Sequence, residues 1–202
     1  MSTSIIIYGA GGHGLVVAEA ADAAGFDVLG FKDEYKSTGS VVGKWTVIDS
    51  RDQSDDAMVI VAIGDNVVRD RLTTELASNG YRLATVIHPT AMISPSAKIG
   101  PGTFVGPFAV VHPEATIGTG VIINSRAVVE HHNRIGSAAH IAPGAVLCGN
   151  VSVGNRTMMG AACVAIPKVT IGQDCVVGAG SVVISDVPDR ARAVGNPVRL
   201  LD

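Results

Sequence analysis

Residues 99–118 read Ile-Gly-Pro-Gly-Thr-Phe-Val-Gly-Pro-Phe-Ala-Val-Val-His-Pro-Glu-Ala-Thr-Ile-Gly, and every sixth residue, counted from the first, is apolar. The period continues in both directions without an insertion, from Ile87 to Val183. Its seventeen positions are Ile87, Ile93, Ile99, Val105, Val111, Ile117, Ile123, Val129, Ile135, Ile141, Leu147, Val153, Met159, Ala165, Ile171, Val177 and Val183. So regular a series in a chain that is 47% apolar indicates an internal repeat rather than chance.

Other positions of the hexapeptide are also restricted. Gly often follows the apolar residue, Pro often stands two residues after it, and a small or β-branched residue stands four after it. Gly and Pro form turns, so a turn in every hexapeptide excludes helices and favours short strands with one inward apolar residue. Such units bury too little alone and must stack. A β-sandwich with regular turns is the alternative, and the constant period disfavours it.

Composition excludes several classes of protein. The chain has 202 residues, a net charge of −3 and 16% charged residues, which disfavours bulk nucleic-acid binding, an anionic membrane surface and disorder. No apolar run approaches the ~18 residues of a membrane span, and the N-terminus lacks the basic region of a signal peptide. The three cysteines form no CxxC motif, so we expect reduced thiols in a cytoplasmic protein.

Residues 1–84 have a different pattern, which predicts an α/β domain resembling half of a Rossmann fold. The expected elements are strands at Ser4–Tyr8, Phe26–Phe31 and Met58–Ile63, and helices at Leu15–Ala24 and Val67–Ser78. Between the first strand and helix lies Gly-Ala-Gly-Gly-His-Gly, residues 9–14. Glycines there let backbone N–H groups approach a phosphate at the helix N-terminus, although a plain tight turn is the alternative. A domain of this size suggests a mononucleotide or nucleotide sugar rather than NAD.

The second half of the chain resembles the hexapeptide-repeat acyltransferases. That resemblance implies a left-handed parallel β-helix over residues 85–187, with three hexapeptides in each coil, and a homotrimer. With the N-terminal domain added, the chain resembles the PglD/NeuD-type sugar acetyltransferases. The implied function is transfer of acetyl from acetyl-CoA to the amine of a nucleotide-linked 4-amino-4,6-dideoxy sugar, with UDP as the expected nucleotide and no metal.

One hexapeptide departs from the Gly/Pro pattern of the repeat. His131 takes a corner position that is Pro in other hexapeptides, and Glu130 precedes it, so this corner carries two ionisable residues. The resemblance implies that His131 is the general base. The family usually has an acidic residue next, whereas this chain has His132. Gly149 lies eighteen residues after His131, one coil away, where its N–H suits a thioester oxygen. A charged surface corner is the alternative explanation.

The resemblance also implies the remaining contacts. For acetyl-CoA they are His140, Gly149, Gly160, Gly178, Ala179, Pro197 and Arg199, the last two in a C-terminal tail of residues 188–202. For the nucleotide sugar they are Gly11, Gly12, His13, Asp33, Glu34, Gly64, Asn66 and Asn124. We expect active sites at subunit interfaces, and neither nucleic acid nor membrane as a partner.

Three other functions stay open at the level of sequence. The first is O-acetylation of a sialic acid or a related sugar. The second is a γ-class carbonic anhydrase, in which His131, His132 and His140 would hold a metal ion. The third is a structural trimer without activity. The nucleotide-type N-terminal domain disfavours the second, and the ionisable corner disfavours the third.

Overall fold

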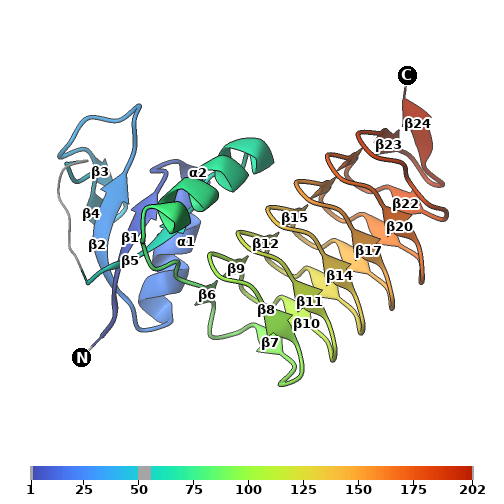
Figure 1. Ribbon diagram of the computed structural model, residues 1–202, viewed down its shortest axis with the longest axis horizontal. Coiled ribbons are helices and arrows are strands. Elements are labelled where there is room, and N and C mark those ends of the chain that lie inside the picture. The colour runs from blue at the N-terminus through green and yellow to red at the C-terminus, as the bar shows by residue number, and fades with distance from the viewer. Residues whose placement is uncertain (1, 50–55, 202) are drawn as a thin grey trace.

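The computed structural model describes residues 2–49 and 56–201. Its N-terminal domain has a three-stranded parallel sheet in the order β2-β1-β5, two helices and a short hairpin (Figure 1). The elements are β1 (Ser4–Tyr8), α1 (Gly12–Ala23), β2 (Asp27–Lys32), β3 (Val41–Val42), β4 (Trp45–Thr46), β5 (Met58–Val61) and α2 (Asn66–Ser78). The predicted strands and helices are confirmed with shifted ends, and the hairpin of β3 and β4 was not predicted.

The glycine-rich loop passes directly into α1, so this helix begins three residues before the predicted Leu15. Gly9 has φ +105°, which favours glycine, and a Cβ at Gly14 would overlap the carbonyl oxygen of Gly9. Glycine is therefore required at both positions by the close approach of strand end and helix.

From β6 onward the chain is a β-solenoid with three faces, each a ladder of two-residue strands. The β6 face contains β6 (Val86–Ile87), β9 (Phe104–Val105), β12 (Ile122–Ile123), β15 (His140–Ile141), β18 (Met158–Met159) and β21 (Val176–Val177). The β7 face contains β7 (Met92–Ile93), β10 (Val110–Val111), β13 (Val128–Val129), β16 (Val146–Leu147), β19 (Val164–Ala165) and β22 (Val182–Val183). The β8 face contains β8 (Lys98–Ile99), β11 (Thr116–Ile117), β14 (Arg134–Ile135), β17 (Ser152–Val153) and β20 (Thr170–Ile171).

Strands eighteen residues apart pair in parallel, as Val110 with Val128 and Thr116 with Arg134. This register confirms the predicted coil of three hexapeptides. All seventeen apolar positions of the series lie in or against one core cluster inside the coils. The small residues four positions after the apolar ones, such as Ala109 and Ala115, are fully buried in the same cluster.

Three edges separate the faces, and each coil turns at all of them. The edge between the β7 and β8 faces carries Pro113, His131, Gly149 and Pro167 in successive coils, and we call it the His131 edge. The edge between the β8 and β6 faces is covered by α2, and we call it the α2 edge. Most corners place a residue in the left-handed region, among them Glu114, His132, Asn150 and Lys168 on the His131 edge.

The C-terminal segment adds two strands to the end of the β6 face. Strand β23 (Arg192–Val194) pairs in parallel with β21, and β24 (Arg199–Leu201) pairs antiparallel with β23. The expected tail of residues 188–202 is therefore, up to residue 201, mostly a closing hairpin. Among residues 2–49 and 56–201, no helix is long and apolar enough to cross a membrane.

The N-terminal domain packs on the first coils of the solenoid, at the opposite end from the C-terminus (Figure 1). Val17 and Ala18 of α1 share a buried cluster with Phe104 and Ile122 of the β6 face. The domain therefore covers the outer side of this face over the coils that also carry His140.

Candidate functional site

His131 lies against bare backbone on the His131 edge. A Cβ built on Gly149, one coil later, would come within 2.6 Å of both Nε2 and Cε1 of the His131 ring. The predicted juxtaposition of the imidazole with Gly149 is thus present in the structure. The main-chain N–H of Asn150 donates to the carbonyl of His131, which ties the two coils together at this corner.

The backbone of Gly149 offers an unused donor beside the ring. Its carbonyl accepts a hydrogen bond from the N–H of Lys168 at 3.1 Å, while its own N–H meets no acceptor in the described part of the chain. An exposed imidazole and a free N–H therefore share this corner, the pair that acyl transfer needs as base and oxyanion donor.

His131 contacts one other imidazole and one carboxylate, and the carboxylate in turn lies near a third imidazole. Nδ1 of His132 lies 3.0 Å from Nδ1 of His131. Glu130 accepts a hydrogen bond from the main-chain N–H of His131 at 3.3 Å, and its other oxygen lies 3.5 Å from Nε2 of His112. Glu130 thus contacts the backbone of His131 and the ring of His112 rather than the ring of His131.

A second cluster lies on the β6 face beneath the N-terminal domain. The N–H of Ser125 donates to Oδ1 of Asn124 at 2.8 Å, which orients the amide so that its Nδ2 donates to Nε2 of His140 at 3.2 Å. His140 therefore carries its proton on Nδ1, a buried atom without a partner in the described chain. The side chain is thus an unused hydrogen-bond donor held in a fixed orientation.

Burial keeps both histidines of this cluster neutral. Burial, followed by the charge of Arg69, lowers the pKa of His140 to about 3 and that of His13 to about 4. The two ring centroids are 6.4 Å apart, and Nε2 of His13 is also buried without a partner. The cluster combines two neutral imidazoles, each with an unsatisfied polar atom, next to the N-terminus of α1.

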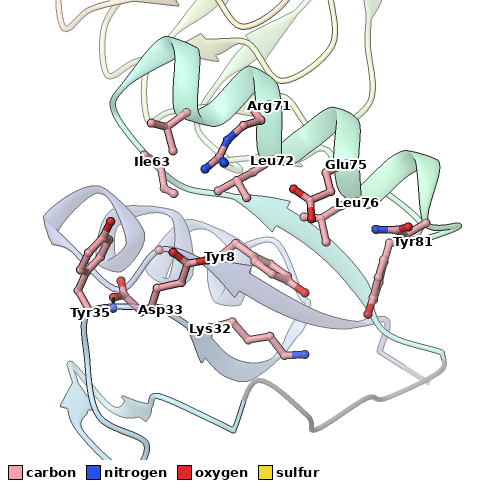
Figure 2. Close-up of a pocket in the computed structure, with 14 residues that line it drawn as sticks. Tyr8, Lys32, Asp33, Tyr35, Ile63, Arg71, Leu72, Glu75, Leu76 and Tyr81 are labelled. Atoms are coloured by element: carbon pink, nitrogen blue, oxygen red, sulfur yellow. Dashed lines mark hydrogen bonds between the residues drawn. The ribbon is translucent and has the colours of Figure 1, made fainter.

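A pocket of about 660 Å³ lies where the strands of the N-terminal sheet end beneath α2 (Figure 2). Asp33 and Glu34 line it, as expected from their place after the second strand. Sequence reasoning missed its other lining residues, among them Tyr8, Tyr35, Ile63, Arg71, Glu75 and Tyr81. Tyr8 is the last residue of β1 and Ile63 follows β5, and that position at a strand end was the one signal available for them.

Two polar residues that line this pocket, Asp33 and Tyr8, differ in how far they are already engaged. Asp33 is already engaged, because Oδ2 accepts from the N–H of Ala10 at 2.7 Å and Oδ1 from the N–H of Tyr35 at 2.8 Å. It thereby fixes the glycine-rich loop. Burial, and secondarily Tyr81, raises the pKa of Tyr8 to about 12, so this phenol stays protonated and remains a donor.

The other predicted sugar-binding residues fall into two groups. Gly11 and Gly12 open α1 without a side-chain cap, and a Cβ on either would meet only open space. Contacts within the chain therefore do not require glycine at either position, and the N-terminus of α1 is accessible there. By contrast, the carbonyl of Gly64 accepts from Arg69, and the Asn66 side chain accepts from Arg69 and donates to the carbonyl of Arg156. Gly64 thus helps to hold Arg69 within the domain, and Asn66 ties the domain to the solenoid.

The residues expected to contact acetyl-CoA are spread along the solenoid. A Cβ on Gly160 would lie 2.5 Å from the carbonyl oxygen of Val177, and one on Gly178 would lie 2.9 Å from Val194. The spacing of coils therefore accounts for glycine at both positions. Ala179, Pro197 and Arg199 are exposed near the end of the solenoid, with Arg199 on β24.

The structure does not bring His131 and His140 together within one chain. With three faces in each coil, the His131 edge lies opposite the β6 face that carries His140. The three histidines considered as metal ligands are divided in the same way. Within residues 2–49 and 56–201, no three His, Cys, Asp or Glu side chains gather to hold a metal ion.

Comparison with known proteins finds a matching family for each half of the chain. The PglD N-terminal domain family matches residues 4–76, and the bacterial transferase hexapeptide family matches residues 96–131. A UDP-N-acetylbacillosamine N-acetyltransferase from Bacillus subtilis is 37% identical over 109 residues. That match spans 50% of this chain and 50% of the relative.

Two solved structures match nearly from end to end. The acetyltransferase domain of PglB from Neisseria gonorrhoeae is 34% identical with a TM-score of 0.93, covering 99% of this chain and 100% of that one. Perosamine N-acetyltransferase from Caulobacter crescentus, a histidine-to-asparagine variant solved with CoA and GDP-perosamine, is 36% identical with a TM-score of 0.94 over 98% and 97% of the two chains. On this likeness over its full length, the chain belongs to the PglD-type sugar N-acetyltransferases with hexapeptide repeats.

Proposed function

We propose that this protein transfers acetyl from acetyl-CoA to the amino group of a nucleotide-linked amino sugar. The observation that carries the proposal is the stacking of His131 on Gly149, whose N–H is free. The relatives support the substrate class, because one is named for UDP-N-acetylbacillosamine and another was solved with CoA and GDP-perosamine.

The reaction follows from the two groups on the His131 edge. The sugar amine attacks the thioester carbon while Nε2 of His131 removes the amine proton. The negative charge that develops on the thioester oxygen is stabilised by the N–H of Gly149. The intermediate collapses by releasing the CoA thiolate, which the imidazolium of His131 can protonate. No acetyl group is attached to the protein in this sequence of steps.

The nucleotide sugar is assigned to the pocket between the N-terminal sheet and α2. Glu34 offers a carboxylate there, which suits the ring N–H of uracil or of guanine, and Tyr8 and Tyr81 offer aromatic surface. The open N-terminus of α1 at Gly11 and Gly12 suits the diphosphate. We retain a UDP-linked 4-amino-4,6-dideoxy sugar as the expected substrate.

A homotrimer would complete this site, and the outer side of the β7 face supports one. Its outward positions are apolar in every coil: Met92, Val110, Val128, Val146, Val164 and Val182. The corresponding positions on the β8 face are Lys98, Thr116, Arg134, Ser152 and Thr170. An apolar ladder facing outward is typical of an interface, and packing through it places the His131 edge at a boundary between subunits.

We assign the protein to the cytoplasm, as the sequence suggested. Cys148, Cys163 and Cys175 are all free thiols, and the last two are buried in the solenoid. Burial raises the pKa of Cys163 to about 12, so this thiol stays protonated and packs in the core rather than acting as a nucleophile.

A kinetic assay with acetyl-CoA and a panel of UDP-, GDP-, dTDP- and CMP-linked amino sugars tests the function. His131→Ala should lower kcat by about 10²–10⁴, the usual contribution of a general base. His88→Ala is the matched control, because the His88 side chain bonds only to Thr90 among the described residues. A rate near that of the wild type for His131→Ala would refute the assignment, and turnover of free sialic acid alone would establish the O-acetyltransferase instead.

A further inference from the structure

The contact between His131 and His132 restricts where the two rings can hold their protons. The two Nδ1 atoms are 3.0 Å apart and the rings are nearly perpendicular, at 87°. A hydrogen bond between two imidazole nitrogens requires one N–H and one lone pair, so the two rings are in different protonation arrangements. Either His131 donates to His132, or the reverse.

Only one arrangement leaves a base where a substrate can reach it. The Nε2 and Cε1 side of His131 faces Gly149, while Nδ1 faces His132. Nε2 has a lone pair in the neutral ring when the proton is on Nδ1. We propose that His132 is a positioning residue. Its unprotonated Nδ1 accepts a hydrogen bond from the Nδ1–H of His131, and this bond leaves Nε2 of His131 free to act as the base. The inference rests on the proposed function.

Glu130, the neighbouring carboxylate, is committed elsewhere. One of its oxygens accepts from the backbone N–H of His131 and the other lies near Nε2 of His112. The other ionisable groups on this edge, among residues 2–49 and 56–201, are Glu114 one coil before, Cys148 one coil after, Lys168 two coils after and Asp186 three coils after. Asp186 accepts a hydrogen bond from the main-chain N–H of Thr170. The acceptor for His131 Nδ1 in this chain is therefore a second imidazole, which supplies a lone pair without a negative charge.

The backbone of the solenoid shows which substitutions position 132 accepts. His132 has φ +61°, and equivalent corners hold Ala138, Asn150 and Asp174 at φ between +52° and +62°. Ala, Asn and Asp therefore fit this conformation. His132→Ala removes the acceptor, and His132→Asn can place a neutral oxygen where Nδ1 lies. His132→Asp places a charged oxygen there.

Steady-state kinetics over a pH series separates these roles. His132→Ala should lower kcat about tenfold or more at neutral pH, with the KM of acetyl-CoA unchanged within about twofold. His132→Asn should recover most of that loss. His132→Asp should be active and should move the acid limb of the kcat/KM profile to higher pH, because a carboxylate stabilises the imidazolium of His131. Equal loss in the Ala and Asn variants, or none in either, overturns the proposal.

Nitrogen-15 NMR of the intact protein tests the same point without a substrate. In the wild type, the neutral His131 ring should carry its proton on Nδ1, and in His132→Ala it should shift to Nε2, the tautomer that free imidazole side chains prefer. A wild-type His131 protonated on Nε2 overturns the inference. Failure of the proposed function is distinguishable, because it would leave these spectra as expected while the wild type acetylates no amino sugar.

Discussion

At the scale of single residues, the His131 edge departs from its own pattern in two consecutive coils. Pro113 and Pro167 occupy the corner position before and after, whereas His131 and Gly149 occupy it between them. The histidine adds a functional ring, and the glycine removes the side chain that would displace it. The observed position of the His131 ring requires the glycine, because a Cβ on Gly149 would lie 2.6 Å from the imidazole.

Gly149→Ala should therefore lower kcat by about 10²–10³ by displacing the His131 ring and disturbing the oxyanion donor. The fold should tolerate the change, since Ala161 takes the equivalent corner position two hexapeptides later. Thermal unfolding should thus shift little while initial rates fall. The double variant with His131→Ala should lose less than the sum of the two single losses, because the part that acts through the ring is counted once. Fully additive losses would show that Gly149 acts independently of the ring.

This juxtaposition was predictable once the family resemblance supplied a coil of eighteen residues, because stacking then depends only on spacing along the chain. The sequence did not predict the bond between His131 and His132, which depends on side-chain rotamers. Nor did it predict that His140 would be buried against His13 with its proton on Nδ1. That state arises from docking of the N-terminal domain and from the orientation of Asn124, neither of which leaves a periodic signal.

At the scale of elements, α2 fixes the N-terminal domain to the solenoid along the α2 edge. The buried guanidinium of Arg69 donates to the carbonyl oxygens of Ile63, Gly120 and Ala138, which belong to the domain and to two successive coils. Arg156 forms ion pairs with Asp70 of α2 and with Asp174 of the next coil. These contacts hold the pocket of the N-terminal domain in one position relative to the solenoid.

Arg69→Met should destabilise the protein by about 3 kcal/mol or more, because several buried carbonyls lose their donor. Burial lowers the pKa of Arg69 to about 10, so the guanidinium is still charged at neutral pH. Urea unfolding measures the loss. Arg71→Met on the exposed side of α2 is the stability control and should change the free energy of unfolding by less than about 0.5 kcal/mol. Equal effects of both substitutions would contradict the proposed role of Arg69.

Elements were predictable where the pattern was long. Seventeen repeats specified the solenoid. The first helix followed from its alanine content and the second from apolar spacing, each with a stop signal at its end. The hairpins were missed for a physical reason. Val41–Val42 and Trp45–Thr46 are two-residue strands, and β24 depends on pairing with β23 at the end of the last coil. Segments so short take their conformation from their partners rather than from their own sequence.

At the scale of the whole molecule, the solenoid separates the two histidines proposed to act in the reaction. His131 lies on one edge, whereas His140 lies on the opposite face beneath the N-terminal domain. The apolar outer ladder of the β7 face ends at the His131 edge and gives a reason for a second copy to pack there.

Placing charge in the middle of this ladder, as in Val128→Lys with Val146→Lys, should yield monomers in sedimentation without loss of the solenoid's circular dichroism signal.

Mixing two inactive variants tests whether subunits share a site. His131→Ala lacks the base on its edge, and His140→Ala lacks the buried donor on its face. If each site takes His131 from one subunit and His140 from its neighbour, random trimers from equal amounts contain about a quarter intact sites. Activity should then rise to about a quarter of the wild-type rate after dissociation and reassembly. Verified exchange of subunits without recovery would contradict a shared site, because both residues would then have to act within one chain, across the full width of the solenoid.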